Sequence, residues 1–146
     1  MDWGRLLGVC LLTGTVMFLV GLPFHLLIPL VCPSIGRQFD NPALFRPWAG
    51  WTRTYMALHP FLAGTLLAVS YHLAQHILGE PQVMCGLRGG VRFAILVFVV
   101  GVVPVYALNY ASFVVSGSVM LSWIVHSGCQ YLAAGVALGL TVRTMR

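Results

Sequence analysis

The chain has 146 residues, of which 59% are hydrophobic and only 8% are charged, whereas a soluble domain carries about 25% charged residues. This composition excludes an ordinary soluble protein, and the length predicts a single bundle over residues 1–146. The net charge of +5 comes from eight arginines and no lysine. The arginines flank apolar runs and form no basic face with interleaved aromatic residues, which excludes nucleic acid as a partner and indicates a lipid bilayer.

The first apolar run predicts a retained transmembrane helix over about residues 6–31. It is too long for the core of a signal peptide, and no small-residue cleavage site follows it. Pro23 and Pro29 are expected to kink or loosen its far end, because proline cannot donate the hydrogen bond that a helix needs.

The connection after this span, residues 32–54, predicts a short helix that lies in the membrane interface. Pro47 suits the first turn of such a helix. One face of this helix is expected to carry four residues at helical spacing, Leu44, Trp48, Trp51 and Tyr55. The alternative is an ordered loop with aromatic anchors at the same depth.

Three further transmembrane helices are predicted over about residues 55–78, 92–115 and 119–142. Residues 93–115 contain no charge, and such a helix is about 34 Å long against a hydrocarbon core of about 30 Å. Gly86, Gly89 and Gly90 indicate a loop between the second and third spans. The predicted fold is therefore an all-α integral membrane protein with four transmembrane helices.

Arginine positions predict the orientation. With four spans, Arg5, Arg88, Arg92, Arg143 and Arg146 lie on one side, and three other arginines lie on the opposite side. Because cytoplasmic connections carry the excess of positive charge, we expect both termini on the cytoplasmic side of an inner membrane.

A resemblance rests on two stretches, Gly86 to Phe93 (GLRGGVRF) before the third span and His126 to Gly139 (HSGCQYLAAGVALG) within the fourth. The region 86–139 resembles a pattern in small, uncharacterised four-span bacterial membrane proteins. The resemblance implies a bacterial inner-membrane protein and implies no activity.

Histidines are the first candidates for chemistry, because polar groups inside spans are costly. His59, His126 and His25 are expected at similar depth in the outer half of the bundle. Histidines on facing helices can hold a haem b iron, and a single one can hold the magnesium of a chlorophyll. The alternative is that these side chains hydrogen-bond lipid headgroups or water, with no cofactor.

His72 and His76 form an i, i+4 pair that can chelate a metal, although no glutamate lies between them. The four cysteines contain no CxxC pair, so neither a disulfide framework nor a zinc site is expected.

Small and polar residues predict where helices meet. A polar seam is expected between the third and fourth spans, and small residues mark faces for close approach. The residues expected to pack helices are Gly64, Ala68, Asn109, Ser112, Ser122, Gln130, Gly135 and Gly139.

No Asp or Glu lies inside a predicted span, and no nucleophile–base pair or nucleotide motif is present. We therefore expect no enzyme, but a non-catalytic accessory or scaffold subunit that packs with other transmembrane subunits of a larger complex, of respiratory or photosynthetic type. One alternative is an electron-transfer subunit that binds haem or chlorophyll, and another is a small channel or carrier.

Overall fold

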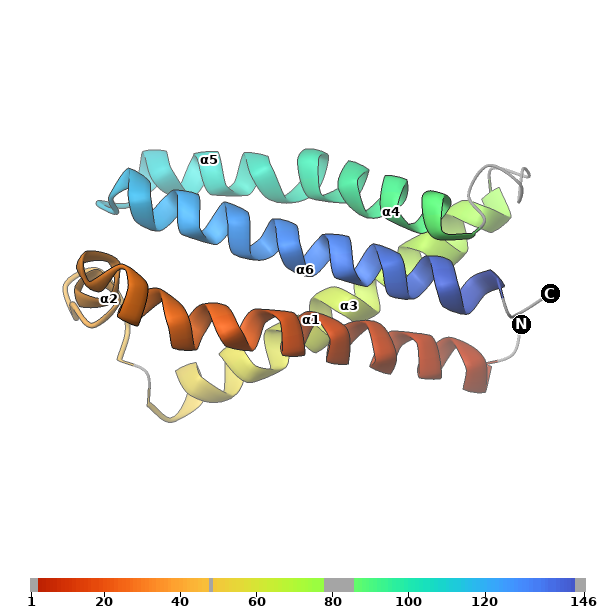
Figure 1. Ribbon diagram of the computed structural model, residues 1–146, viewed down its shortest axis with the longest axis horizontal. Helices are drawn as coiled ribbons and strands as arrows, with labels where there is room; N and C mark the ends of the chain where they lie inside the picture. The colour runs from red at the N-terminus through yellow and green to blue at the C-terminus, as the bar shows by residue number, and fades with distance from the viewer. Residues whose placement is uncertain (1–2, 48, 78–85, 144–146) are drawn as a thin grey trace.

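The computed structural model describes residues 3–47, 49–77 and 86–143. Within these residues the fold is entirely helical, and the first connection between long helices contains one short helix (Figure 1). The helices are α1 (Trp3–Val31), α2 (Pro33–Phe39), α3 (Trp51–Ile77), a continuous helix made of α4 (Gly86–Val97), the π-helical turn η1 (Phe98–Val102) and α5 (Val103–Ser112), and finally α6 (Gly117–Arg143).

Three of the helices are long and apolar enough to cross a membrane: Trp3–Val31, Trp51–Ile77 and Gly86–Ser112. The fourth predicted span lies in α6, which has 27 residues but is not among these three. Polar residues such as His126 and Gln130 lower the hydropathy of α6. The first residues of α1 and α4 lie at the same end of the molecule as the last described turn of α6, and α2 lies at the opposite end (Figure 1).

Prolines inside the long helices do not interrupt them. α1 continues through Pro23 and Pro29 to Val31, so its far end is an unbroken helix rather than a loosened segment. Pro104 follows the π-helical turn η1. Because proline cannot donate to the carbonyl four residues earlier and crowds it, the wider turn accommodates the ring without ending the helix.

The first connection contains a short helix, but not where the sequence pattern indicated. The short helix is α2, which begins at Pro33 and not at Pro47. Leu44 lies in a turn, and Trp51 and Tyr55 belong to α3, while Trp48 lies outside the described residues. Proline at the first helical position favours the observed start, because its fixed φ is helical and its missing donor would be unpaired there.

The glycines before the third span form a helix rather than the expected loop. α4 begins at Gly86, whose φ is +70°, and includes Gly89 and Gly90. Residues 79–85 of that predicted loop lie outside the described residues. The glycines are helical because they allow α4 to approach α6 closely: a Cβ on Gly90 would overlap the carbonyl oxygen of Gly135 and lie 2.6 Å from the amide nitrogen of Gly139.

The helix pair α1–α3 also meets at glycine. A Cβ on Gly64 would lie 2.6 Å from the Cα of Gly14, so the two backbones touch at this crossing. Ala68, the small residue one turn later, is 1% exposed. Around these crossings the core contains Met17, Leu67, Tyr71, Phe93, Ala94, Ala134 and Leu138.

The long helices pack most extensively in three pairs. α1 packs against α3 and α6, and α4 packs against α6. α3 crosses behind α1 (Figure 1), and among the described residues its Cα atoms do not come within 8 Å of those of η1 or α5. This divergence leaves a groove between α3 and the η1 region.

Candidate functional site

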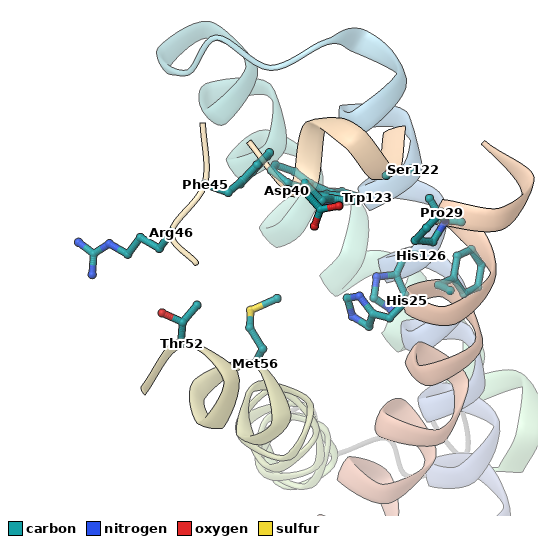
Figure 2. Close-up of a pocket in the computed structure, with 14 residues that line it drawn as sticks. His25, Pro29, Asp40, Phe45, Arg46, Thr52, Met56, Ser122, Trp123 and His126 are labelled. Atoms are coloured by element: carbon teal, nitrogen blue, oxygen red, sulfur yellow. The ribbon is translucent and has the colours of Figure 1, made fainter. Parts of the chain in front are cut away.

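A cavity of about 400 Å³ lies at the α2 end of the bundle, between α1, α2, α3 and α6 (Figure 2). We call it the end cavity. Aromatic and aliphatic side chains form most of its wall, and a few polar groups point toward the same space, which is the usual composition of a small-molecule site. Its lining residues are Phe24, His25, Ile28, Pro29, Gly36, Phe39, Asp40, Phe45, Arg46, Thr52, Met56, Ser122, Trp123 and His126.

A local turn and an aromatic cluster fix the roof of the end cavity. The carbonyl of Asn41 accepts hydrogen bonds from the amides of Leu44 (3.0 Å) and Phe45 (2.9 Å), and its side-chain oxygen accepts one from Ala43 at 3.0 Å. This turn brings Phe45 back onto Phe39 of α2, with ring centroids 5.6 Å apart. The chain leaving α2 is therefore held over the cavity.

Trp123 of α6 joins this cluster. Its ring lies 6.4 Å from Phe39, 5.8 Å from Phe45 and 6.2 Å from Tyr106 of α5, measured between centroids. Aromatic pairs at such distances attract each other by about 0.5–1.5 kcal/mol beyond area burial. The cluster thus connects α2, the following turn, α5 and α6 into one wall.

Two of the three histidines expected at similar depth meet at the deep side of this cavity. The rings of His25 and His126 are 5.1 Å apart and nearly perpendicular, and Phe24 stacks on His126 at 5.0 Å. The Nε2 atom of His126 is buried and has no hydrogen-bond partner among the described residues. It faces α1 at Gly21, where an added Cβ would lie 2.9 Å from it.

This geometry limits what His25 and His126 can ligate. Two imidazoles on opposite sides of one iron, each about 2 Å from the metal, would have centroids roughly 6 Å apart with a macrocycle between them. At 5.1 Å and edge to face, the two rings contact each other directly and leave no room for a macrocycle between them. The described residues also contain no group of three or more His, Cys, Asp or Glu side chains placed to hold a metal ion.

The third histidine, His59, belongs to a different surface. It lines a groove of about 410 Å³ between α3 and the η1 region. We call this groove the α3–η1 groove. Its lining residues are Tyr55, His59, Leu62, Ala63, Leu66, Leu67, Ser70, Val97, Gly101, Val102 and Tyr131.

The predicted chelating pair lies in the second half of α3. The rings of His72 and His76 are 4.5 Å apart and nearly perpendicular, as expected for i, i+4 neighbours on one helical face. The Nε2 atom of His72 is buried without a hydrogen-bond partner among the described residues. No third ligand joins the pair in the described part of the chain.

The predicted polar seam between the third and fourth spans forms differently. Gln130 points to α1, where its Nε2 donates to the carbonyl of Met17 at 2.9 Å. Ser122 donates to the carbonyl of Val119 in its own helix, and Ser112 is exposed. The hydrogen bond that joins α5 to α6 is made by Tyr106 and Ser127, which the sequence pattern did not single out.

Gly135 and Gly139, expected to pack helices, lie against α4. A Cβ on Gly135 would be 2.7 Å from the Cβ of Ala94, and one on Gly139 would be 2.6 Å from the carbonyl oxygen of Gly86. The partner face on α4, Gly86 and Gly90, repeats the same four-residue spacing. That repeat is visible in the sequence and predicts the pairing once the glycines are taken as helical rather than as a loop.

Asp40, Phe45 and Trp123 were missed as site residues, because their meeting depends on the turn at Asn41.

No family model matches the chain, and no curated protein or solved structure shows significant similarity to it.

Proposed function

We propose that this chain is a non-catalytic four-span subunit of a larger membrane complex, and that a transmembrane helix of another subunit occupies the α3–η1 groove. The observation that carries the proposal is the divergence of α3 from the continuous helix α4–η1–α5. In a closed four-helix bundle these neighbours would pack together. Here they leave a groove with apolar walls.

The wall of the groove suits a helix. Leu62, Leu66 and Val97 supply apolar contacts, and Gly101 provides a gap with no atom within 4 Å of an added Cβ. Helices in membranes associate through small residues that permit close approach and through isolated polar groups that hydrogen-bond across the interface. His59 and Tyr131 are such polar groups in this wall.

The glycines of the other crossings are already occupied within the chain. Gly64, Gly90, Gly135 and Gly139 contact neighbouring helices closely, so they are not free for a partner. Gly101 lies in the groove wall and has no atom within 4 Å of an added Cβ, so a partner helix can approach it closely.

The proposed orientation follows from the arginines. Arg5, Arg88 and Arg92 lie at the end of the bundle where α1 and α4 begin, and α6 ends at Arg143 at the same end (Figure 1). On the other side, Arg37 lies in α2, Arg46 follows α2, and Arg53 lies in the first turn of α3. With α6 as the fourth span, this distribution favours both termini on the cytoplasmic side of an inner membrane.

Native mass analysis after gentle solubilisation of the source membranes tests this proposal. We expect a hetero-complex for the wild-type chain and its loss in Gly101→Leu, because the leucine fills the groove. Gly8→Leu is the matched control, since an added Cβ there also meets nothing within 4 Å and Gly8 lies on α1, away from the groove. A monomer or simple homo-oligomer of the wild-type chain would contradict the proposal.

Pigment or haem binding through His126 alone is the second candidate, supported by the buried Nε2 of His126, which has no hydrogen-bond partner among the described residues. It requires the ring of His126 to turn away from Gly21 before Nε2 becomes accessible. An absorption spectrum of protein purified from its native source tests it: a Soret or chlorophyll band that disappears in His126→Ala but persists in His76→Ala would support the candidate. Gln130 and Ser122 donate hydrogen bonds to backbone carbonyls within the bundle, so these two side chains do not support the alternative of a channel or carrier.

A further inference from the structure

The end cavity has an asymmetric arrangement of charge. Asp40 is the one acidic side chain in the described part of the chain, and it ends α2 at the cavity roof. Its carboxylate points into the cavity, whereas the guanidinium of Arg46 points away from it (Figure 2). The cavity therefore presents an anion inward and no arginine or lysine.

Aromatic side chains line the same cavity as this carboxylate. Phe39, Phe45 and Trp123 line the cavity and contact one another. Aromatic faces attract cations, tryptophan most strongly. A metal ion such as Ca²⁺ takes about six to eight oxygen ligands, and the described residues contain no group of three or more His, Cys, Asp or Glu side chains that could hold a metal ion. This lining therefore favours an organic ammonium group. The rest of the lining, including Ile28 and Met56, is apolar.

We propose that the end cavity binds an amphipathic organic ammonium, with its cationic group between Asp40 and the Trp123 cluster and its apolar body toward Ile28 and Met56. His25, His126 and Thr52 offer hydrogen-bond donors and acceptors to the rest of the ligand. Such a group occurs on free amphipathic amines and on the headgroup of an ammonium phospholipid. The inference is independent of the partner proposed for the α3–η1 groove.

The test uses the full chain in bilayers of an uncharged glycolipid, whose surface does not concentrate cations, with Trp3, Trp48 and Trp51 replaced by Phe so that Trp123 reports alone. Benzyltrimethylammonium is titrated and compared with its uncharged isostere, in which carbon replaces the nitrogen, and with benzenesulfonate. We expect saturable fluorescence change with the cation, at least about tenfold weaker binding of the isostere, and no binding of the sulfonate.

Asp40→Asn should weaken ammonium binding about tenfold, since a charge-assisted contact is lost. Phe45→Leu should weaken it about two- to fivefold. Arg46→Gln is the matched control and should bind as the wild type does, because Arg46 points away from the cavity. Equal affinity for the cation and its isostere, or unchanged binding in Asp40→Asn, would overturn the proposal. The comparison of ligands on wild-type protein remains decisive if a variant fails to fold.

Phosphatidylethanolamine bilayers distinguish the two sources of the ammonium group. If lipid headgroups occupy the cavity, the apparent affinity for benzyltrimethylammonium falls in these bilayers relative to the glycolipid, because phosphatidylethanolamine carries the ammonium group without net charge. If a free amine is the ligand, the affinity is the same in both. Either result supports ammonium binding only when the cation is preferred over its isostere.

Discussion

Substituting Gly90 by alanine tests the close crossing of α4 and α6. The added Cβ would overlap the carbonyl oxygen of Gly135 and lie 2.6 Å from the amide nitrogen of Gly139. Because ordinary contact is about 3.5 Å, the helices must separate by about 1 Å. Gly8→Ala is the control, since its Cβ meets nothing within 4 Å.

The cost follows from lost dispersion contacts. If the crossing contains about as many atom pairs as one buried leucine, roughly 50 at about 0.15 kcal/mol each, a gap of about 1 Å forfeits a quarter to a half of them, or about 2–4 kcal/mol. Alanine returns about 0.5–1 kcal/mol through helix propensity, so the net loss is about 1–3 kcal/mol. Gly8→Ala should instead be neutral or stabilising.

Unfolding measured by steric trapping in bilayers would give the difference in free energy between the two variants. Gly64→Ala should resemble Gly90→Ala, since its Cβ would lie 2.6 Å from the Cα of Gly14. If Gly90→Ala and Gly8→Ala agree within about 0.5 kcal/mol, the reasoning about this crossing is refuted.

Three further predictions concern single residues. Gln130→Leu should lower the free energy of unfolding by about 0.6–2 kcal/mol, because the hydrogen bond from Gln130 to the carbonyl of Met17 joins α6 to α1. Ser112→Ala is the control and should leave the free energy of unfolding unchanged. Equal losses in the two variants would contradict the role of the Gln130 hydrogen bond. Gly36→Val should push α2 away from Pro29, because even a Cβ at position 36 would lie 3.0 Å from the Cβ of Pro29. The substitution should therefore weaken ammonium binding in the Trp123 fluorescence titration, and unchanged binding would contradict the fixed position of the cavity roof. Cys32 is exposed and is proposed to face outward, so a membrane-impermeant maleimide on intact cells should label it and should spare Cys10, which is buried. If Cys32 reacts only in inverted vesicles, the orientation is the reverse of the proposed one.

The long helices were predictable because each coincides with a long apolar run of the sequence. The predicted spans begin and end within a few residues of α1, α3 and α6, since charges and turn residues stop an apolar run in any context. The third span begins earlier than expected, at Gly86, because packing against Gly135 and Gly139 makes helical use of glycines that look like a loop in isolation.

The candidate site was predictable only in part. Depth along a helix follows from the rise per residue, and His25 and His126 do meet. The direction in which a side chain points depends on helix crossing angles, which the sequence does not encode locally. For that reason the sequence did not reveal that Gln130 points to α1, that His59 faces the α3–η1 groove, or that Asp40 faces the end cavity.

Site-specific photocrosslinking in native membranes tests the central claim, occupation of the α3–η1 groove by a partner helix. A photoreactive residue at position 101 should yield one discrete protein adduct, whose protein also copurifies stoichiometrically with the wild-type chain and is lost in Gly101→Leu. The same residue at position 8, which is equally open, should yield lipid adducts only. Lipid adducts alone from both positions would contradict occupation of the groove by a protein.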